Sequence, residues 1–424
     1  MFSLVNSFSA FDFNQINNRF SCDDSGVDSV SGAISCSNAG GCSSSGAISS
    51  DIRYITLPFF FEGKPASESF GDAAVPSCVM SLASAGSLRY NSGLENPPRK
   101  KFLNEVLPDG VVSVPVYLMH SKTVFVAEQD TSFQGGVGLV APDSEVRVPV
   151  GAEGDGIITS CRSFAPCVTA ADCMPVFLWD SRTGAFGICH SGWKGTGIAA
   201  KAVALMCTSF GAKPADICVI LGPHIHECCY TVDAERAAYF RREFSPDCVS
   251  SCENDAPCPP ADTAVTVATA CGAPCSHAGG DSGAVGVSGG GFCGNKSALK
   301  TDGLFRLSLA RANIVSLVNA GIKPENILHC TDCTSCFSLP ATSGADYTSD
   351  KTAASSVAGG ATISSVSTSG TPATAGSRDA GARFFPYGSF RRQTAHLPEG
   401  TPLEERFKVF SAMAAVIGYG CGQK

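Results

Sequence analysis

Two short apolar runs joined by four turn-forming residues constrain the fold of this chain most strongly. Residues 175–180 (PVFLWD) and 185–190 (AFGICH) are the runs, and Ser-Arg-Thr-Gly connects them. Runs this close in sequence, with glycine in the connection, are typical of an antiparallel β-hairpin. Residues 197–210 follow with apolar side chains at helical spacing. The sequence therefore predicts a hairpin, a glycine turn and a helix in that order.

Other predicted elements alternate between strand and helix. Residues 111–126 have extended character with a break at 119–121, and residues 216–221 resemble another strand. A second helix is predicted over 304–320, because leucine, isoleucine and valine recur on one stripe and Gly321 stands just beyond the C-terminal end. This alternation predicts a mixed α/β fold, an α+β sandwich built as a single domain.

Three segments consist mainly of Ser, Gly, Ala and Thr. No Lys or Arg occurs in residues 20–52 or 243–295 of the 424-residue chain, and residues 341–380 contain a single aromatic residue. Such segments bury too little apolar surface to offset the entropy cost of ordering them. We therefore expect a largely disordered N-terminal extension over 1–53, and one domain over 54–424 with low-complexity insertions at 245–295 and 341–380.

The charge balance excludes several classes of function. The chain has 30 Lys and Arg against 38 Asp and Glu, a formal net charge of −8. This gives no basic footprint for nucleic acid. No apolar run reaches the roughly 18 to 20 residues of a membrane-spanning helix, and the N-terminus lacks the features of a secretory signal. We expect a cytoplasmic protein without nucleic-acid or membrane partners, whose 22 cysteines are reduced thiols or metal ligands.

Two groups of cysteines do not match standard metal motifs. Cys330-x2-Cys333-x2-Cys336 resembles part of an iron–sulfur motif, but the fourth cysteine of that motif is absent and phenylalanine follows Cys336. The spacing in the middle insertion fits no zinc ribbon or finger, and compositional drift explains it better than a metal site. The cysteines of that insertion are Cys248, Cys252, Cys258, Cys271, Cys275 and Cys293.

The predicted hairpin brings a thiol and an imidazole together. Cys173 immediately precedes its first strand and His190 ends its second, so antiparallel pairing places the two side by side. Zinc accepts mixed sulfur and nitrogen ligands, and three protein ligands with one open position is its catalytic arrangement. His120 is the only histidine before Cys173 and completes such a set. The alternative is that Cys173 and His190 are ordinary buried residues, because free cysteine is often buried.

The chain resembles the laccase-domain proteins, once named multicopper polyphenol oxidases and also described as zinc-dependent purine nucleoside phosphorylases. The motifs that carry the resemblance are LMHSKTV, GDGIITS, TAADCMPVFLWD, GICHSGWKGTG, ILGPHIHECCYTVD, CTDC at 330–333 and the Phe-Phe to Arg-Arg block ending at Arg392. They cover most of 54–245 and 296–420, and their order along the chain makes the resemblance specific.

The resemblance implies both a metal site and a reaction. His120, Cys173 and His190 correspond to the family's metal ligands, which implies zinc; copper is the less favoured ion. The implied activity is phosphorolysis of adenosine, inosine, guanosine and methylthioadenosine to the free base and sugar 1-phosphate, with adenosine deaminase activity at the same site. The partners are then a purine nucleoside and phosphate. Asp172, next to a ligand, is expected to orient a histidine or, less favoured, to shuttle a proton.

The glycine turn before the helix predicted over 197–210 has its own physical interpretation. Backbone N–H groups at a helix N-terminus attract phosphate, and Lys194 adds a full charge. We expect Lys194, Gly195, Thr196 and Arg391 to bind substrate or phosphate. An equally weighted alternative is a tight turn in which Thr196 caps the helix.

Several positions depart from the family pattern. Met119 stands before the first histidine, Lys194 replaces arginine, and His224 and His226 occupy a loop that normally carries small residues. We interpret His224 and His226 as polar loop or pocket residues rather than metal ligands. The Phe-Phe to Arg-Arg block is lengthened, which leaves the register of Arg391 open. These departures motivate two alternatives to the phosphorylase: a copper-dependent polyphenol oxidase and a non-catalytic binding protein.

Overall fold

A computed structural model describes most of the chain outside the low-complexity segments. The described residues are 5–11, 52–90, 94–142, 146–252, 304–340 and 383–423. β1 (Asn6–Phe8), from the expected N-terminal extension, pairs in parallel with β18 (Ile327–Cys330). β16 (Val249–Ser251) lies within the expected insertion 245–295 and pairs with β17 (Phe305–Leu307). Almost all other residues of these segments lie outside the described residues.

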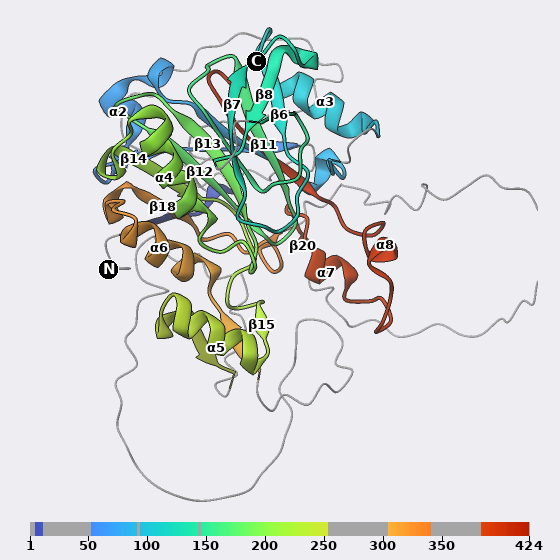
Figure 1. Ribbon diagram of the computed structural model, residues 1–424. Helices are drawn as coiled ribbons and strands as arrows, with labels where there is room; N and C mark the ends of the chain where they lie inside the picture. Colours follow the sequence, from blue (N-terminus) through green and yellow to red (C-terminus); the bar gives the residue numbers. More distant parts are fainter. Residues whose placement is uncertain are drawn as a thin grey trace, which may run out of the picture.

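A nine-stranded mixed sheet forms the centre of the molecule (Figure 1). β12, one of its central strands, is buried along its whole length. Val176 and Leu178 of β12 pack on one face, and Phe177 and Trp179 pack on the other. The strands in order across the sheet are β1, β18, β14 (Ile217–Leu221), β12 (Met174–Asp180), β13 (Phe186–Ser191), β10 (Gly156–Thr159), β7 (Val124–Gln129), β8 (Val137–Val140) and β9 (Arg147–Pro149).

A second, five-stranded sheet packs against one face of the first. Val168 and Ile417 from this sheet share a core with Phe177 and Ile188 from the nine-stranded sheet. Its other face is covered by α3 (Pro97–Val106), which contributes Phe102. The strands in order are β2 (Tyr54–Leu57), β5 (Ser77–Ser81), β21 (Met413–Gly418), β11 (Phe164–Ala170) and β6 (Val112–Pro115).

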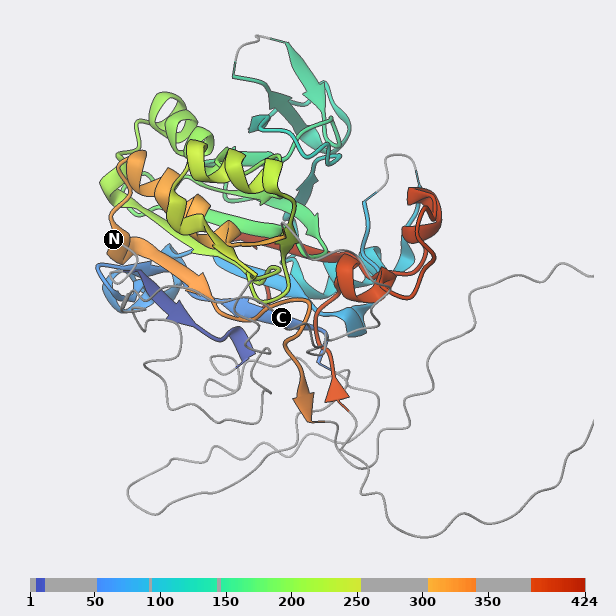
Figure 2. The same cartoon turned by 90° about the horizontal axis from the view of Figure 1, so that it is seen from below.

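Helices cover the outer face of the nine-stranded sheet. α4 (Ile198–Phe210) and α6 (Leu309–Asn319) lie on this face, and α5 (Ala234–Glu243) follows beside a small sheet of β15 (Thr231–Val232), β17 and β16. Figure 2 shows these helices on one side of the two stacked sheets. The predicted α+β sandwich is therefore confirmed. The shorter elements are α2 (Ala66–Phe70), α7 (Phe390–Thr394), α8 (Leu403–Arg406), β3 (Phe60–Phe61), β4 (Lys64–Pro65), β19 (Leu339–Pro340) and β20 (Arg383–Phe384).

The predicted local elements are largely confirmed, with one error. The hairpin is β12 and β13, and the helix over 197–210 is α4. The predicted helix over 304–320 is wrong at its start, because 305–307 form β17 and the Ser308 hydroxyl accepts a hydrogen bond from the Arg311 N–H as the N-cap of α6. Within the described residues, no helix has both the length and the apolar character needed to cross a bilayer.

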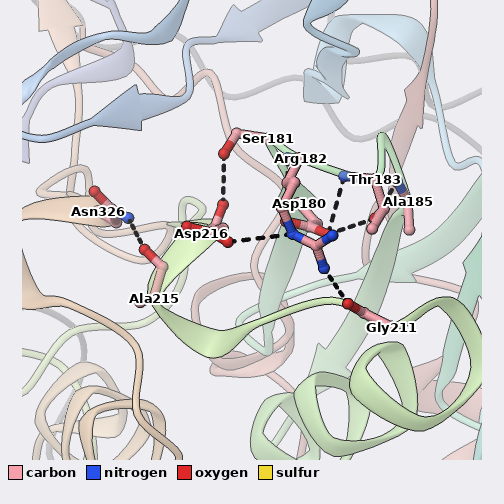
Figure 3. A network of polar contacts seen from close by, with 9 residues as sticks. All are labelled: Asp180, Ser181, Arg182, Thr183, Ala185, Gly211, Ala215, Asp216 and Asn326. Atoms are coloured by element: carbon pink, nitrogen blue, oxygen red, sulfur yellow. Dashed lines mark hydrogen bonds and ion pairs between the residues drawn. The ribbon is translucent and has the colours of Figure 1, made fainter.

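The turn of the central hairpin is held by a buried carboxylate. Asp180 is fully buried and accepts hydrogen bonds from the backbone N–H groups of Arg182 and Thr183 at 3.3 and 3.2 Å, and from the Thr183 hydroxyl. Arg182 also forms an exposed ion pair with Asp216, 3.4 Å apart (Figure 3). The carboxylate of Asp180, rather than the ion pair, therefore carries the turn.

Replacing Asp180 by Ala is expected to lower the free energy of unfolding by about 1–3 kcal/mol, because three hydrogen bonds to a buried carboxylate are lost. Urea denaturation measures the loss. The matched control is Asp216→Ala, which breaks only the exposed ion pair and is expected to cost less than about 1 kcal/mol. Equal losses for the two variants would contradict this account of the turn.

Candidate active site

The three predicted metal ligands lie together at one edge of the nine-stranded sheet. Pro175 pairs with His190 across the hairpin, so Cys173, just before β12, lies beside the end of β13. His120 comes from the loop between β6 and β7, and its ring centroid is 4.9 Å from that of His190. The ligand atoms of His120, Cys173 and His190 all lie within 4.8 Å of one another. One thiol and two imidazoles in this arrangement fit a tetrahedral ion.

A buried carboxylate that sequence analysis missed fixes two of these ligands. Asp155 is fully buried and accepts the backbone N–H of His120 at 3.0 Å and that of Ser121 at 2.6 Å. Its Oδ1 is also 3.0 Å from Nδ1 of His190. This contact occupies Nδ1 and leaves Nε2 of His190 for the metal, as carboxylates do for metal-binding histidines. The only sequence signal for Asp155 was its place in the GDG motif.

The position of Asp172 corrects the expectation that it orients a histidine. Asp172 has a φ of +81°, a backbone conformation that residues other than glycine rarely adopt. Its carboxylate accepts the Thr334 hydroxyl at 2.8 Å and the backbone N–H of Arg391 at 2.7 Å. Burial raises the pKa of Asp172 although these hydrogen bonds act in the opposite direction. Asp155, rather than Asp172, orients His190.

The charges within the site favour a cysteine thiolate. Burial alone would raise the pKa of Cys173, but the charge of His190 and a hydrogen bond from His120 lower it to about 6. Burial would lower the pKa of His190, whereas the Cys173 thiolate and Asp155 raise it to about 10. A thiolate is the form of cysteine that binds metals. The site therefore holds Cys173 ready to act as a ligand near neutral pH.

The close approach of the ligands requires a glycine. A Cβ atom at Gly192 would lie 2.9 Å from Sγ of Cys173 and 3.4 Å from Cδ2 of His120. Gly195 is similarly confined, because its Cβ would lie 3.0 Å from the carbonyl oxygen of Ser121. The glycines of this turn thus allow the backbone to pass beside the metal ligands.

The residues expected to bind phosphate at this turn are dispersed. Lys194 is exposed, with its amino group 5.4 Å from the centroid of the Trp193 ring. Thr196 is buried and donates its hydroxyl to the carbonyl of Gly192 at 3.0 Å. The N-cap of α4 is Gly197, so the expectation that Thr196 caps the helix is wrong.

Two arginines lie against aromatic rings: Arg236, which sequence analysis missed, and Arg391, which it predicted to bind phosphate. The Arg236 guanidinium lies 4.1 Å from the centroid of the Trp193 ring, and Arg391 lies 5.3 Å from that of Tyr230. Arg391 is held by hydrogen bonds from its guanidinium to the hydroxyl and carbonyl oxygens of Thr231, at 2.9 and 3.3 Å. Burial raises the pKa of Tyr230, and its phenol interacts electrostatically with Arg236, Cys173 and Arg391. Tyr230 thus links the metal ligands to two arginines.

The rings of His224, His226 and His329 lie together. From the sequence, His224 and His226 were interpreted as polar loop or pocket residues rather than metal ligands. The rings of His224 and His226 stack 4.2 Å apart at 27°, and those of His226 and His329 stack 5.2 Å apart at 18°. Burial lowers the pKa of each to about 3, so all three are neutral. A metal lies in the plane of each imidazole that binds it. The stacking is therefore unfavourable for binding, but the rings of His224 and His329 are tilted by 44° and the three ligand atoms lie within 4.8 Å of one another, so this group could also hold a metal ion.

The cysteines of the Cys-x2-Cys-x2-Cys motif separate in the structure. Cys330 is buried between the two sheets. Cys333 and Cys336 instead lie beside the adjacent pair Cys228 and Cys229, and the four sulfur atoms are within 4.8 Å of one another. Only two cysteines of the motif therefore join this cluster, and a loop distant in sequence supplies the other two.

Part of the chain matches a known protein family. Residues 110–262 match the family described as multi-copper polyphenol oxidoreductase laccase. Over these residues, about a third of the chain, the protein is similar to this family, which confirms the resemblance seen in the sequence. His120, Cys173 and His190 all lie within the matched range.

The chain is also similar to curated relatives over part of their length. Purine nucleoside phosphorylase LACC1 of Mus musculus is 38% identical over 105 residues, covering 24% of this chain and 24% of that protein. A purine nucleoside phosphorylase of Clostridium acetobutylicum is 39% identical over 90 residues, 21% of this chain and 38% of that protein. Adenosine deaminase RL5 of an unknown prokaryotic organism is 35% identical over 89 residues, 21% of this chain and 34% of that protein.

A solved structure aligns over more of the chain. The hypothetical protein YfiH of Bacillus licheniformis has a TM-score of 0.46 and 20% identity, covering 81% of this chain and 92% of that one.

Replacing Gly192 by Ala is expected to disrupt the metal centre without unfolding the domain, because the added methyl group meets Cys173 and His120. We expect zinc affinity to fall by at least about tenfold, corresponding to about 1.4 kcal/mol. Competition with a chromogenic chelator measures the affinity, and circular dichroism monitors the fold. The control is Gly400→Ala, which strains the backbone at a φ of +82° but whose methyl group would meet no atom within 4 Å, so it should leave zinc affinity unchanged. Unchanged zinc affinity in Gly192→Ala would contradict the predicted clash.

Proposed function

We propose that this chain is a zinc-dependent purine nucleoside phosphorylase that also deaminates adenosine. Its nucleoside substrates are adenosine, inosine, guanosine and methylthioadenosine, which it cleaves to the free base and sugar 1-phosphate. The observation that carries the proposal is the cluster of His120, Cys173 and His190, with Tyr230 linking it to cationic side chains. The names of the relatives support the same class of enzyme.

The donor set supports zinc as the metal. One thiolate and two imidazoles leave a tetrahedral zinc one open position. When bound, zinc would polarise a substrate oxygen or lower the pKa of a water molecule toward 7. The copper alternative requires several copper ions with their own histidines. The chain has seven histidines, two of which belong to the cluster with Cys173, and this number is too small for several histidine-ligated copper ions.

The arginines near Tyr230 support phosphate as the co-substrate. Arg391 and Arg236 carry charge without a carboxylate partner among the described ion pairs. A phosphate dianion binds strongly to such guanidinium groups. Lys194 beside Trp193 adds charge at the rim, and Lys122 lies near Gly197 at the N-terminus of α4. Phosphate held here would lie beside the metal ligands, where the ribose must bind for phosphorolysis.

Asp172 acts in this proposal as a positioning residue. Its carboxylate is occupied by the Thr334 hydroxyl, the Arg391 backbone N–H and the Ser389 hydroxyl. These hydrogen bonds leave little capacity for carrying a proton. They fix the start of α7 and therefore the point from which the Arg391 side chain extends toward Thr231. This contribution replaces the proton-shuttle role considered from the sequence.

Replacing His190 by Ala is expected to abolish zinc binding at this centre and both nucleoside activities, because a metal ligand is lost. Asp155→Asn keeps all three ligands but removes the charge that orients His190, so we expect zinc affinity to fall about 10–100-fold. The assays are metal analysis and chromatography of adenosine reactions. Adenine should form only when phosphate is present, and inosine should form without it.

Four results would contradict the proposal. Unchanged turnover in folded His190→Ala protein would exclude the metal centre. Adenine formation without phosphate would indicate hydrolysis rather than phosphorolysis. Phenol oxidation by copper-loaded wild-type protein would favour the oxidase alternative, and wild-type protein with neither metal nor turnover would favour a non-catalytic binding protein.

Replacing Arg391 by Ala is expected to raise the KM for phosphate by about 10–100-fold, because a charge-assisted contact contributes about 1.5–3 kcal/mol. Arg391→Lys keeps the charge but not the two-pronged geometry, so its KM should be intermediate. Initial rates at varied phosphate concentration measure the effect. The control is Arg147→Ala, whose arginine pairs with Glu128 and Asp130 on the surface. An unchanged KM for phosphate in Arg391→Ala would remove Arg391 from the phosphate site.

A further inference from the structure

Four cysteines form a compact cluster separate from the candidate active site. Cys228 and Cys229 follow β14, and Cys333 and Cys336 follow β18, the neighbouring parallel strand. The parallel pairing brings the two loops to the same edge of the sheet, and a backbone bridge between His224 and Cys333 joins them. The topology thus places two cysteine pairs face to face although they are far apart in sequence.

The spacing of the sulfur atoms fits a single tetrahedral ion. Sγ of Cys228 is 3.8 Å from Sγ of Cys229 and 3.6 Å from Sγ of Cys336. A zinc–sulfur bond of about 2.3 Å in tetrahedral geometry separates neighbouring sulfur atoms by about 3.8 Å. A disulfide would bring two sulfur atoms to about 2.05 Å, so these separations exclude a disulfide from Cys228 to Cys229 or Cys336. A cubane cluster binds each thiolate to a different iron and therefore needs wider spacing.

The surroundings of the cluster suit a charged tetrathiolate complex. Zinc with four thiolates has a net charge of −2, which nearby cations and N–H groups must stabilise. Arg392 interacts electrostatically with Cys229, Cys333 and Cys336. Its guanidinium donates to the carbonyl oxygens of Thr334 and Ser335, at 2.7 and 3.0 Å, between the two cysteines of the Cys-x2-Cys pair.

Backbone contacts hold the ligands in place before any ion binds. The N–H of His226 is 3.4 Å from Sγ of Cys333, and Arg306 donates to the carbonyl oxygen of Cys228 at 3.0 Å. The Asp332 carboxylate, next to Cys333, accepts the Tyr387 hydroxyl at 2.6 Å. Cys333 itself is only 5% exposed. The contacts of Arg306 and Asp332 therefore anchor the two loops independently of the cysteine side chains.

We propose that Cys228, Cys229, Cys333 and Cys336 bind a second, structural zinc ion that joins the loop after β14 to the loop after β18. Four protein ligands close the coordination sphere, as in structural rather than catalytic zinc sites. This site shares no ligand with His120, Cys173 and His190. Its existence therefore does not depend on the proposed enzymatic activity.

The test compares the zinc content of full-length variants purified under reducing conditions. Wild-type protein should contain about one more zinc per chain than Cys336→Ser, whose half-buried serine should be tolerated by the fold. The control is Cys161→Ser, a half-buried cysteine near Ser163 that belongs to neither cluster. His190→Ala should lose a different zinc, so that His190→Ala/Cys336→Ser loses both. Equal zinc content in wild-type and Cys336→Ser protein would overturn the proposal.

A second measurement needs no substitution in the cysteine cluster. In His190→Ala protein, a mercurial reagent titrated in the presence of a zinc indicator should release one zinc as four thiolates react. Cobalt substitution of the same protein should give strong thiolate-to-cobalt absorption that is lost in the double variant. Iron at this site, or a disulfide between Cys228 and Cys336 in reduced protein, would overturn the assignment to zinc.

Discussion

The candidate active site depends on one buried carboxylate. Asp155 accepts hydrogen bonds from the N–H groups of His120 and Ser121 and contacts Nδ1 of His190. Burial would raise the pKa of Asp155, but the contacts with His190 and Ser121 lower it. A charged carboxylate so deep in the protein is tolerated because these partners replace water. The same hydrogen bonds hold His120 at a φ of +57°, a conformation that costs about 1–3 kcal/mol for a residue other than glycine.

Asp155 and Asp172 hold different parts of the candidate site. Asp155 fixes the histidines, whereas Asp172, adjacent to Cys173, fixes Thr334 and Arg391. Both carboxylates are buried, but they have different hydrogen-bond partners and therefore different roles. A change at Asp155 should therefore act on metal binding, and a change at Asp172 on the placement of the arginine. This division follows from the partners of the two carboxylates, because Asp155 contacts Nδ1 of His190 whereas Asp172 accepts the Thr334 hydroxyl and the Arg391 N–H.

Local patterns predicted the hairpin, α4 and the meeting of Cys173 with His190, because 17 residues of chain and one tight turn bring the last two together. The predicted start of this helix was wrong because leucines at 304 and 307 suit helical spacing. In the structure, pairing of β17 with β15 and β16 makes residues 305–307 a strand instead. The partners of Asp155 were not predictable without the register of the sheet. The cysteine cluster was missed for the same reason, since 108 residues separate Cys228 from Cys336.

The proposed structural zinc would also stabilise the substrate site. The loop that carries Cys333 and Cys336 contains Thr334, which donates to Asp172, and Asp172 in turn accepts the N–H of Arg391. The loop that carries Cys228 and Cys229 ends at Tyr230, whose ring lies against Arg391. A zinc ion joining these loops would therefore hold the phosphate-binding arginine from two directions. On this proposal, one metal centre supplies the chemistry and a second maintains the geometry in which phosphate reaches it.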